Sequence, residues 1–494
     1  MKTLKSLFVL TILSVSINLF SQQSKLDLHQ CIVIATDSSL QAFRAKNIYR
    51  ASYWEYKSYK AARLPLLSLQ MTPVRYNRDI VSRYDSENNI DVYRQQQSLY
   101  AYGNLSLSQN VDFTGGTFFI DSELGYFRNM GTNPYSQFTS VPLRMGYSQS
   151  LFGFNSFKWE RKIEPLKYEK AKKEYLYSTE EIAGTVIQYF FNLAMAQMEY
   201  DLAVENVNSS DSLYSIGTER LKIAAISQSD LLTLKLDALN AKNTLKTVDV
   251  DLKRAMFSFV SFLNLPKNTE IRLVLPPLPT EIPVTAQQAL SLSVANNPDY
   301  LQNQQNLLES QREVERTERK AAFDATFSAS VGFNQVADNF RSAYDKPLQQ
   351  DVVRIGLNIP LVDWGVRKGK VNMAKSNLNV TRISTEQSQT NLEQDVVLTV
   401  SDFGVQLNLI ASAEEAKELA NMAFNSTKQR FIIGKADINS LTLSLGRLNT
   451  AQKNYIVALK NYWLSYYKLR KLTLFDFEKN SSLSCQFDQL MNIR

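Results

Sequence analysis

Residues 229–262 read SDLLTLKLDALNAKNTLKTVDVDLKRAMFSFVSF, and residues 439–472 read NSLTLSLGRLNTAQKNYIVALKNYWLSYYKLRKL. Both segments carry a series of positions spaced 3.5 residues apart on average, mostly apolar, over five heptads in the same phase. A sustained seven-residue repeat is typical of coiled-coil helices. Each segment is therefore predicted to be one coiled-coil helix, roughly 50–60 Å long at 1.5 Å per residue. In the first segment the series is Leu231, Leu234, Ala238, Ala241, Leu245, Val248, Leu252, Met256, Phe259 and Phe262.

The two segments belong to a longer internal repeat. Residues 149–265 align with residues 359–475 at a constant offset of 210 positions without a gap, so that Arg220 corresponds to Arg430. A segment near the start of the chain repeats at an offset of 258 positions. A unit of more than a hundred residues is a duplicated domain rather than a short-period solenoid. Any functional prediction must therefore use both copies.

A second long helix is predicted just upstream of each coiled-coil segment. Residues 160–221 and 370–431 are helix-favouring over about 60 positions each. Such a helix would reach roughly 90 Å if it is continuous. Together with the coiled-coil segments, these helices predict two antiparallel hairpins, at about 154–265 and about 366–474.

Shorter helices are predicted to open the two copies. Asp27-x-x-Gln30 and Thr285-x-x-Gln288 both fit a capping box before an apolar-periodic run. The first helix is expected to extend to about residue 62 and the second to about residue 322. A Pro-rich stretch between the copies is predicted to be an extended linker. The expected organisation is a first repeat at 22–274, the linker at 275–283, a second repeat at 284–478 and a tail at 479–494.

Between the opening helix and the hairpin of each copy, the period falls from 3.6 to 2. This alternation predicts β-strands at about 66–151 and about 325–361, with Gly115-Gly116 as a tight turn. The first β-region is about 48 residues longer than the second, by the difference between the two offsets, and has room for four strands. Three polar stretches are expected to be exposed loops, namely 77–97, 128–138 and 335–349.

The first 21 residues are predicted to be a secretion signal, with Lys2 and Lys5 before an apolar run and Ser21 at a plausible cleavage site. The run is too short to cross a bilayer as a helix. No later stretch reaches 18 apolar residues. Membrane contact by the mature chain would then use β-strands or a surface attachment, because only helices and closed barrels satisfy the backbone in lipid.

The composition offers no support for catalysis, for metal binding or for a nucleic-acid partner. Cys31 and Cys485 are the only cysteines, and His29 is the only histidine. Cys31 is predicted to be a small buried thiol, and His29 an exposed residue at a helix start. The sequence lacks a metal-ligand cluster, a His-dependent triad and a glycine-rich phosphate loop, so no cofactor is expected. The net charge of +7 is dispersed along helical stretches rather than gathered in a basic, aromatic patch.

A few strands per copy cannot close a barrel, and an open sheet edge is excluded from lipid. The strands are therefore either a small soluble sheet or a share of one barrel that several chains build together. The secretion signal and the aromatic residues of the alternating segments favour the shared barrel.

These features resemble the TolC-like outer membrane efflux protein family (outer membrane factors) over nearly the whole mature chain. The resemblance lies in the tandem order of helix, β-region and long helix pair, and in the strand-to-helix passages 149–153 and 359–365. The segments 220–232 and 430–437 look like the helix-hairpin tips of that family.

The resemblance implies an α+β membrane protein with the tandem-repeat TolC-like fold. Three copies would share one outer-membrane β-barrel, continued by a coiled-coil α-barrel through the periplasm of a Gram-negative bacterium. Such channels dock onto a periplasmic adaptor (membrane fusion) protein and an inner-membrane RND or ABC transporter. They serve as the exit duct of a tripartite efflux pump or a type I secretion system. A twelve-strand barrel is the default, and the longer first β-region leaves a larger barrel or a folded extracellular cap as alternatives.

The resemblance also places a gate and adaptor contact at the hairpin tips, near 223–230 and 433–443. Family members often carry two acidic residues one helical turn apart on the inner helix of the second hairpin, where this chain has Ser440 and Leu443. Asp437 can still contribute one ring of three carboxylates, although helix capping is the alternative role for Asp230 and Asp437. The candidate residues for the gate or the adaptor contact are Arg220, Asp230, Arg430, Gly434, Lys435, Asp437, Ser440 and Leu443.

Two other functions stay open at this point. A periplasmic adaptor also uses coiled-coil hairpins, but it would normally have one hairpin flanked by compact β-domains. An outer-membrane barrel adhesin or enzyme is the second alternative, and an enzyme would need a convergent set of acid, base or nucleophile. Fractionation with outer membranes would favour the channel over the adaptor.

Overall fold

The computed structural model describes residues 24–130, 134–223, 226–484 and 487 of the chain. The predicted signal peptide lies outside these residues. The chain forms two compact units, and each unit draws on both sequence repeats. Unit 1 comprises residues 1–49, 172–298 and 390–494, and unit 2 comprises residues 50–171 and 299–389.

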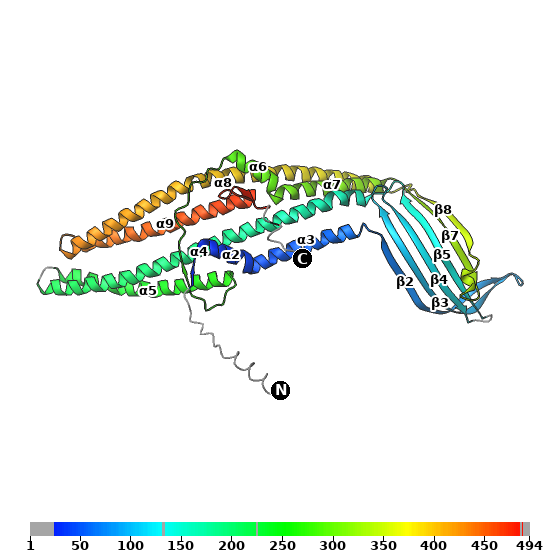
Figure 1. Ribbon diagram of the computed structural model, residues 1–494, viewed down its shortest axis with the longest axis horizontal. Helices are drawn as coiled ribbons and strands as arrows, with labels where there is room; N and C mark the ends of the chain where they lie inside the picture. Colours follow the sequence, from blue (N-terminus) through cyan, green and yellow to red (C-terminus); the bar gives the residue numbers. More distant parts are fainter. Residues whose placement is uncertain (1–23, 131–133, 224–225, 485–486, 488–494) are drawn as a thin grey trace, which may run out of the picture. The chain divides into compact units, whose positions relative to one another are not determined.

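Most of each predicted helical hairpin lies in unit 1. The first hairpin joins α4 (Ser156–Lys222) to α5 (Gln228–Phe262), and the second joins α8 (Val366–Ile432) to α9 (Ile438–Thr473), as Figure 1 shows. The first parts of α4 and α8 belong to unit 2. Ring contacts hold each hairpin together, and an ion pair between α4 and α9 joins the hairpins. The helices of unit 1 therefore pack in the order α5, α4, α9, α8.

The heptad series identifies the packed face of α9. Seven-residue spacing predicts ten positions, of which Ala451 and Tyr455 are half-buried. The other eight are buried, namely Leu441, Ser444, Leu448, Ala458, Tyr462, Tyr466, Leu469 and Leu472. The same series is buried less completely in α5, where Leu234, Ala238 and Phe259 are the covered members. Apolar residues elsewhere on α5, among them Leu232 and Leu236, are more than half exposed.

Helix α8 has apolar residues on more than one face. It contains an 18-residue stretch with a mean hydropathy of 1.4, which is long and apolar enough to cross a membrane by these criteria alone. Phe403 on α8 packs against Tyr462 on α9, whereas Leu398, Leu409 and Met422 on α8 are more than half exposed. The apolar composition therefore reflects a helix that is packed within its hairpin and also has an uncovered apolar face.

Each opening helix is divided in two rather than continuous. The first copy has α2 (Leu28–Ser38) and α3 (Leu40–Ala61), and the second has α6 (Ala286–Asn296) and α7 (Pro298–Ala321). Asp27 and Gln30 form the predicted capping box. The second helix breaks at Asn297, because a residue that precedes proline disfavours helical backbone. The first breaks at Ser39, whose hydroxyl accepts a hydrogen bond from the backbone of the next helix.

Other sequence predictions are confirmed nearby. Cys31 is fully buried, and burial raises the pKa of its thiol to about 12, so that it stays protonated. His29 is exposed at the start of α2. The Pro-rich linker is extended, and just before it β6 (Ile271–Leu273) pairs in parallel with β1 (Ser24–Leu26). After α9, β9 (Phe475–Asp476) pairs with β10 (Ser481–Ser482).

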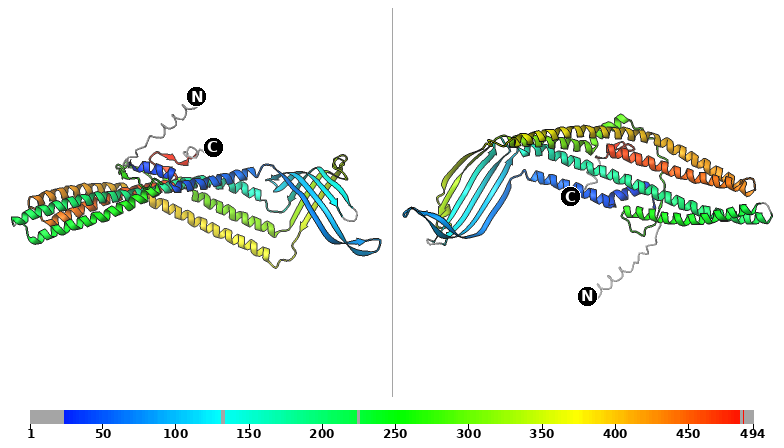
Figure 2. Two further views of the ribbon diagram at one scale, coloured as in Figure 1. Left: turned by 90° about the horizontal axis from the view of Figure 1, so that it is seen from below. Right: turned by 180° about the vertical axis from the view of Figure 1, so that it is seen from behind.

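Unit 2 contains one antiparallel sheet of six strands among the described residues, in the order β2-β3-β4-β5-β7-β8. Figure 2 shows these strands side by side as a curved layer. The first β-region thus holds four strands, and Gly115 turns between β3 and β4 with a φ of +77°. The strands are β2 (Leu66–Asp85), β3 (Ile90–Val111), β4 (Gly116–Asn129), β5 (Tyr135–Ser150), β7 (Asp324–Ala337) and β8 (Leu348–Asn358).

The prediction of an exposed loop at 77–97 is wrong. After a bulge between Thr72 and Arg75, β2 and β3 stay paired as far as Asp85 and Ile90. Both faces of this two-stranded ribbon carry charged or amide side chains, which weakens the alternation by which a half-buried strand is recognised. The predicted loop at 128–138 is also shorter than expected, because its first residues belong to β4 and its last residues to β5. The ends of the predicted loop at 335–349 belong to β7 and β8.

The register of the sheet gives it two distinct faces. One face carries apolar side chains from all six strands, including Leu69, Leu105, Ile120, Met145, Val331 and Ile355. The other face carries mainly polar and aromatic residues, among them Gln70, Asn104, Glu123, Arg144 and Ser330. We call these the apolar face and the polar face of the sheet.

Candidate functional site

The tip of the second hairpin is built by two local caps. Gly434, with a φ of +78°, ends α8, and Lys435 N–H donates a 2.8 Å hydrogen bond back to the Arg430 carbonyl. This is the Schellman arrangement that a left-handed glycine permits. Asp437 then caps α9 by accepting a 2.7 Å hydrogen bond from the Ser440 backbone N–H. Hydrogen bonding with the Ser440 side chain and backbone lowers the pKa of Asp437 below its usual value of 3.8.

The tip of the first hairpin uses a capping box, and two of its residues, 224 and 225, lie outside the described part of the chain. Asp230 N–H donates to the Ser227 hydroxyl at 3.1 Å, and the Asp230 carboxylate accepts from the Ser227 backbone N–H at 3.0 Å. Side-chain and backbone hydrogen bonds with Ser227 lower the pKa of Asp230. Both candidate aspartates therefore have capping roles in this structure.

Arg220 joins the two tips. Its guanidinium, on the last turn of α4, donates hydrogen bonds to the Ile432 carbonyl at 2.7 Å and to the Phe431 carbonyl at 3.3 Å. It also lies 5.7 Å from the centre of the Phe431 ring. A cation at the C-terminal end of a helix satisfies carbonyl groups that have no partner within the helix. The charge of Arg220 thus caps a helix of the other hairpin.

The structure brings some of the eight candidate residues together and leaves others apart. Arg220 lies beside Gly434, and Asp437 is bonded to Ser440. Arg430, Lys435 and Leu443 are exposed. Because Ser440 and Leu443 are uncharged, the charged groups described at the second tip are Arg430, Lys435 and Asp437.

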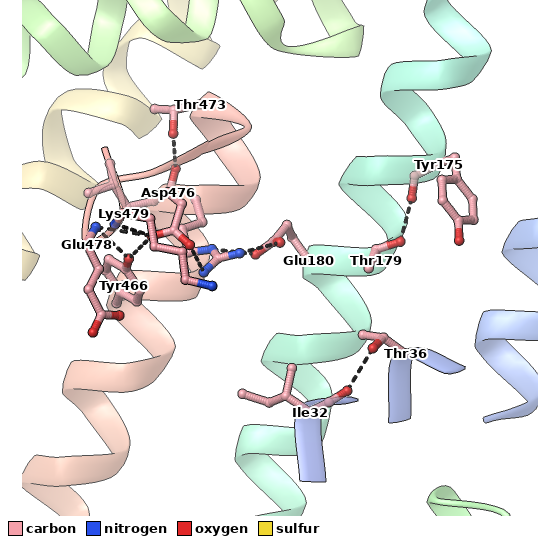
Figure 3. A network of polar contacts seen from close by, with 12 residues as sticks. Ile32, Thr36, Tyr175, Thr179, Glu180, Tyr466, Thr473, Asp476, Glu478 and Lys479 are labelled. Atoms are coloured by element: carbon pink, nitrogen blue, oxygen red, sulfur yellow. Dashed lines mark hydrogen bonds and ion pairs between the residues drawn. The ribbon is translucent and has the colours of Figure 1, made fainter. Parts of the chain in front are cut away.

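The sequence did not predict a buried ionic network in unit 1. Arg470 on α9 forms a fork-like pair with Glu180 on α4 through two hydrogen bonds of 2.9 Å, and reaches Asp476 at 3.0 Å. The Tyr466 hydroxyl donates to the other Asp476 oxygen at 2.9 Å. Figure 3 shows Glu180 pointing from its helix toward Tyr466 and Asp476. Glu180 and Arg470 are 290 residues apart, so no local spacing signals their pairing.

Burial and pairing oppose each other in this network. Burial raises the pKa of Glu180 above its usual range, and the Arg470 guanidinium offsets only part of that effect. Burial alone would lower the pKa of Arg470, but the Glu180 and Asp476 carboxylates raise it well above its ordinary value. Arg470 is therefore charged at all physiological pH values and is the group that holds the two carboxylates together.

A second cluster lies on the polar face of the sheet. Arg144 on β5 donates to both oxygens of Asp121 on β4, at 3.0 and 2.6 Å, and to Glu123 at 3.1 Å. Tyr102 and Asn104 on β3 donate to the same Glu123 oxygen. Three adjacent strands are thus cross-linked by one polar network whose charges are paired.

Neither cluster has the composition of a catalytic or metal centre. Among the described residues, no group of three or more His, Cys, Asp or Glu side chains could hold a metal ion. A cavity of about 810 Å³ lies between the Pro-rich linker, α2, α4 and α9 in unit 1. Its lining is mainly apolar and aromatic, including Tyr462, Trp463 and Leu278.

Comparison with known proteins shows what the chain is similar to. The profile of the outer membrane efflux protein family matches residues 289–473. The toxin and drug export protein A of Aggregatibacter actinomycetemcomitans is 22% identical over 312 residues. That match covers 61% of this chain and 59% of the relative, so it spans less than two thirds of the relative's length.

Solved structures show the same fold at low sequence identity. The outer membrane protein VceC from Vibrio cholerae matches with a TM-score of 0.64 and 13% identity, over 90% of this chain and 95% of that one. The CmeC outer membrane channel of Campylobacter jejuni matches with a TM-score of 0.64 and 11% identity, over 93% and 89% of the two chains. The chain therefore has the TolC-like fold of these solved outer membrane channels, and its residues 289–473 match the outer membrane efflux protein family.

Proposed function

We propose that this chain is one third of a trimeric efflux channel that forms an exit duct from the periplasm of a Gram-negative bacterium. One observation carries the proposal: the sheet is apolar on one face from edge to edge, and its edge strands β2 and β8 have no second neighbour among the described residues. Unpaired backbone groups cannot stay in lipid, so strands of other copies must complete the barrel wall.

The helices support the same assembly. The hairpins leave apolar residues exposed on α5 and α8, including Leu232, Leu236, Leu398 and Leu409. Large apolar patches on a single chain are typical of interaction surfaces. In a trimer these faces would pack against neighbouring copies, as in the α-barrel that the family resemblance implies.

The proposed partners are a periplasmic adaptor and an inner-membrane RND or ABC transporter. An RND partner would make the assembly a tripartite efflux pump, and an ABC partner also suits type I secretion. The curated relative is described as a toxin and drug export protein, a description compatible with either system. Co-purification of the chain with candidate adaptors, followed by identification of the inner-membrane component, separates the two systems.

Transport through the channel is passive, and the hairpin tips form its gate. An adaptor that binds a dilated tip more tightly than a closed tip would shift the population toward the open channel. The caps at Asp230 and Asp437 and the contact from Arg220 stabilise the tips in the arrangement described above.

Planar-bilayer recording of the purified protein tests this function. Discrete conductance steps from a trimer in outer-membrane fractions are expected. The variant Asp437→Asn removes the charge and keeps a capping side chain, and Asp230→Asn does the same at the other tip. Reduced cation preference in these variants supports a charge role at the gate, and an unchanged preference excludes it. A protein that stays soluble, monomeric and non-conducting would favour the periplasmic adaptor instead.

A further inference from the structure

The first β-region contains one more strand pair than the second. Strands β2 and β3 with their turn occupy residues 66–111, which is close to the excess of about 48 residues in the first copy. The start of this pair and its end lie together: Arg63, just before β2, pairs with Asp112, just after β3. The Asn155 side chain, before α4, donates to the Asp112 carbonyl at 2.9 Å. The pair therefore leaves and returns to the same end of the sheet, as an inserted hairpin would.

This hairpin is part of the sheet rather than a cap upon it. Strand β3 pairs with β4 without a register shift from Ser98 opposite Asn129 to Val111 opposite Gly116. The apolar face continues across it, where Leu67 and Leu69 on β2 lie opposite Leu107 and Leu105 on β3. A cap folded outside the membrane would not need this apolar continuity.

The polar face is continuous across the same boundary. Tyr102 and Asn104 on β3 donate hydrogen bonds of 2.9 and 3.1 Å to Glu123 on β4. Beyond the bulge at Thr72 and Arg75, β2 and β3 extend as the two-stranded ribbon. Pro73 within the bulge lacks a backbone donor, which is tolerated at the edge of a sheet. The part of β2 that belongs to the barrel wall is therefore residues 66–72.

The two sheet edges are complementary. Strand β2 begins, and β8 ends, at the end of the sheet that is joined to helices, so the two strands run antiparallel. Leu67, Leu69 and Met71 on β2 are 61–64% exposed, and Val353, Ile355 and Leu357 on β8 are 63–70% exposed. Both sets point to the apolar face, so β2 can pair with β8 of another copy without a break in that face.

We propose that the β2–β3 hairpin is an inserted pair of wall strands, and that β2 of each copy pairs with β8 of the next. The proposal rests on the trimeric channel proposed above. Six strands are fewer than the eight of the smallest membrane barrels, so one chain cannot close its own wall. Three copies of a six-stranded sheet give eighteen strands, in place of the twelve expected from the family resemblance.

An eighteen-strand wall changes where the channel is narrow. Barrels of 16–18 strands leave an open aqueous passage, and barrel diameter grows roughly in proportion to strand number. The membrane segment of this channel is then about one and a half times as wide as a twelve-strand barrel. Cargo size is limited at the helical hairpin tips rather than at the outer-membrane mouth.

Disulfide trapping tests the edge pairing in the full-length protein. In a background with Cys31→Ala and Cys485→Ala, Leu69→Cys is combined in turn with Val353→Cys, Ile355→Cys and Leu357→Cys. One of these combinations is expected to yield covalently linked trimers, because only one register is correct. The control pair Leu69→Cys with Arg354→Cys places one thiol on each face and should yield none. If Ile120→Cys on β4 couples to β8 instead, the hairpin lies outside the wall and the proposal is wrong.

Deletion of residues 66–111 separates this proposal from the proposed function. The deletion is expected to leave a conducting trimer of twelve strands, whose outer mouth excludes polyethylene glycols about one third smaller in diameter than those excluded by the full protein. The polyethylene glycols are added on the side of the outer mouth, so that the hairpin tips do not set the result. A conducting trimer whose outer mouth keeps the same size limit contradicts the eighteen-strand wall and leaves the channel intact. Absence of trimers and conductance in the full-length protein overturns both proposals. If the deletion variant alone fails to fold, the disulfide pattern of the full-length protein decides whether β2 pairs with β8 of the next copy.

Discussion

Arg220 at the end of α4 donates a 2.7 Å hydrogen bond to the backbone carbonyl of Ile432 at the end of α8. The contact ties the tip of the first hairpin to the tip of the second. Arg430, the counterpart of Arg220 in the sequence repeat, is instead exposed on its own hairpin. The two copies therefore keep the same residue at this position, but only Arg220 contacts the other hairpin through these hydrogen bonds.

Replacing Arg220 tests that connection. Arg220→Met retains most of the aliphatic stem and removes both hydrogen bonds to α8, each of a kind worth about 1.5–3 kcal/mol when one partner is charged. We expect the channel to be open for a larger fraction of the time, so that its resting conductance in planar bilayers rises several-fold. Arg430→Met is the matched control and should leave conductance unchanged. Equal conductance in both variants and the wild type would show that Arg220 does not hold the tip.

The cap at Asp437 makes the second tip sensitive to acid. Hydrogen bonding with Ser440 lowers the pKa of Asp437 in the folded chain, so its stabilising effect is fully present above the unfolded value of 3.8. That effect is lost as the pH falls through the folded pKa. Amide hydrogen exchange at the start of α9 should therefore accelerate below about pH 4 beyond the intrinsic pH effect. The Asp437→Asn side chain can cap the helix but does not titrate, so this variant should show no such acceleration. The same acceleration in Asp437→Asn would mean that another titrating group causes it.

Loss of Arg470 should destabilise unit 1 strongly. Arg470→Met leaves Glu180 and Asp476 buried without their cation, and breaking a buried ion pair costs about 3–5 kcal/mol. The midpoint of thermal unfolding, followed by helix circular dichroism in detergent, should fall. Adding Glu180→Met should restore part of the loss, because an apolar pair replaces one of the two carboxylates left without Arg470, whereas Asp476 stays buried without it.

The control for this experiment is on the same helix. Lys468 pairs with Asp395 at 2.8 Å, but both side chains are nearly half exposed. Exposed pairs contribute about 0–1 kcal/mol, so Lys468→Met should barely move the midpoint. A comparable drop for Lys468→Met and Arg470→Met would contradict a special role for the buried network.

The two faces of the sheet predict opposite tolerance to charge. Leu105 lies on the apolar face and Ser106, its neighbour on β3, on the polar face. Leu105→Lys should cost about 2–4 kcal/mol near the membrane midplane and reduce trimer assembly in outer-membrane fractions. Ser106→Lys should assemble at wild-type levels. If Ser106→Lys is the defective variant, the assignment of the lipid-facing side is reversed.

Much of the site was predictable because capping is local. The heptad series located both hairpins, and Ser227, Gly434 and Asp437 act at positions where the sequence already predicted helix ends. The eight-residue candidate set also contained Arg220, although its bond to Ile432 spans 212 residues and has no sequence signal. The Arg470 network was missed for the same reason, since Glu180 lies 290 residues away.

The sequence by itself determined the local architecture: the duplication, the coiled-coil period, the helix caps and the strand alternation all depend on spacings of a few residues. The tertiary structure alone decided which segments meet, including Arg220 at α8, Arg470 at Glu180 and the four strands of the first β-region within one sheet. The physical reason is that backbone conformation responds to near neighbours. Pairing across hundreds of residues depends instead on burial, register and charge compensation in the packed chain.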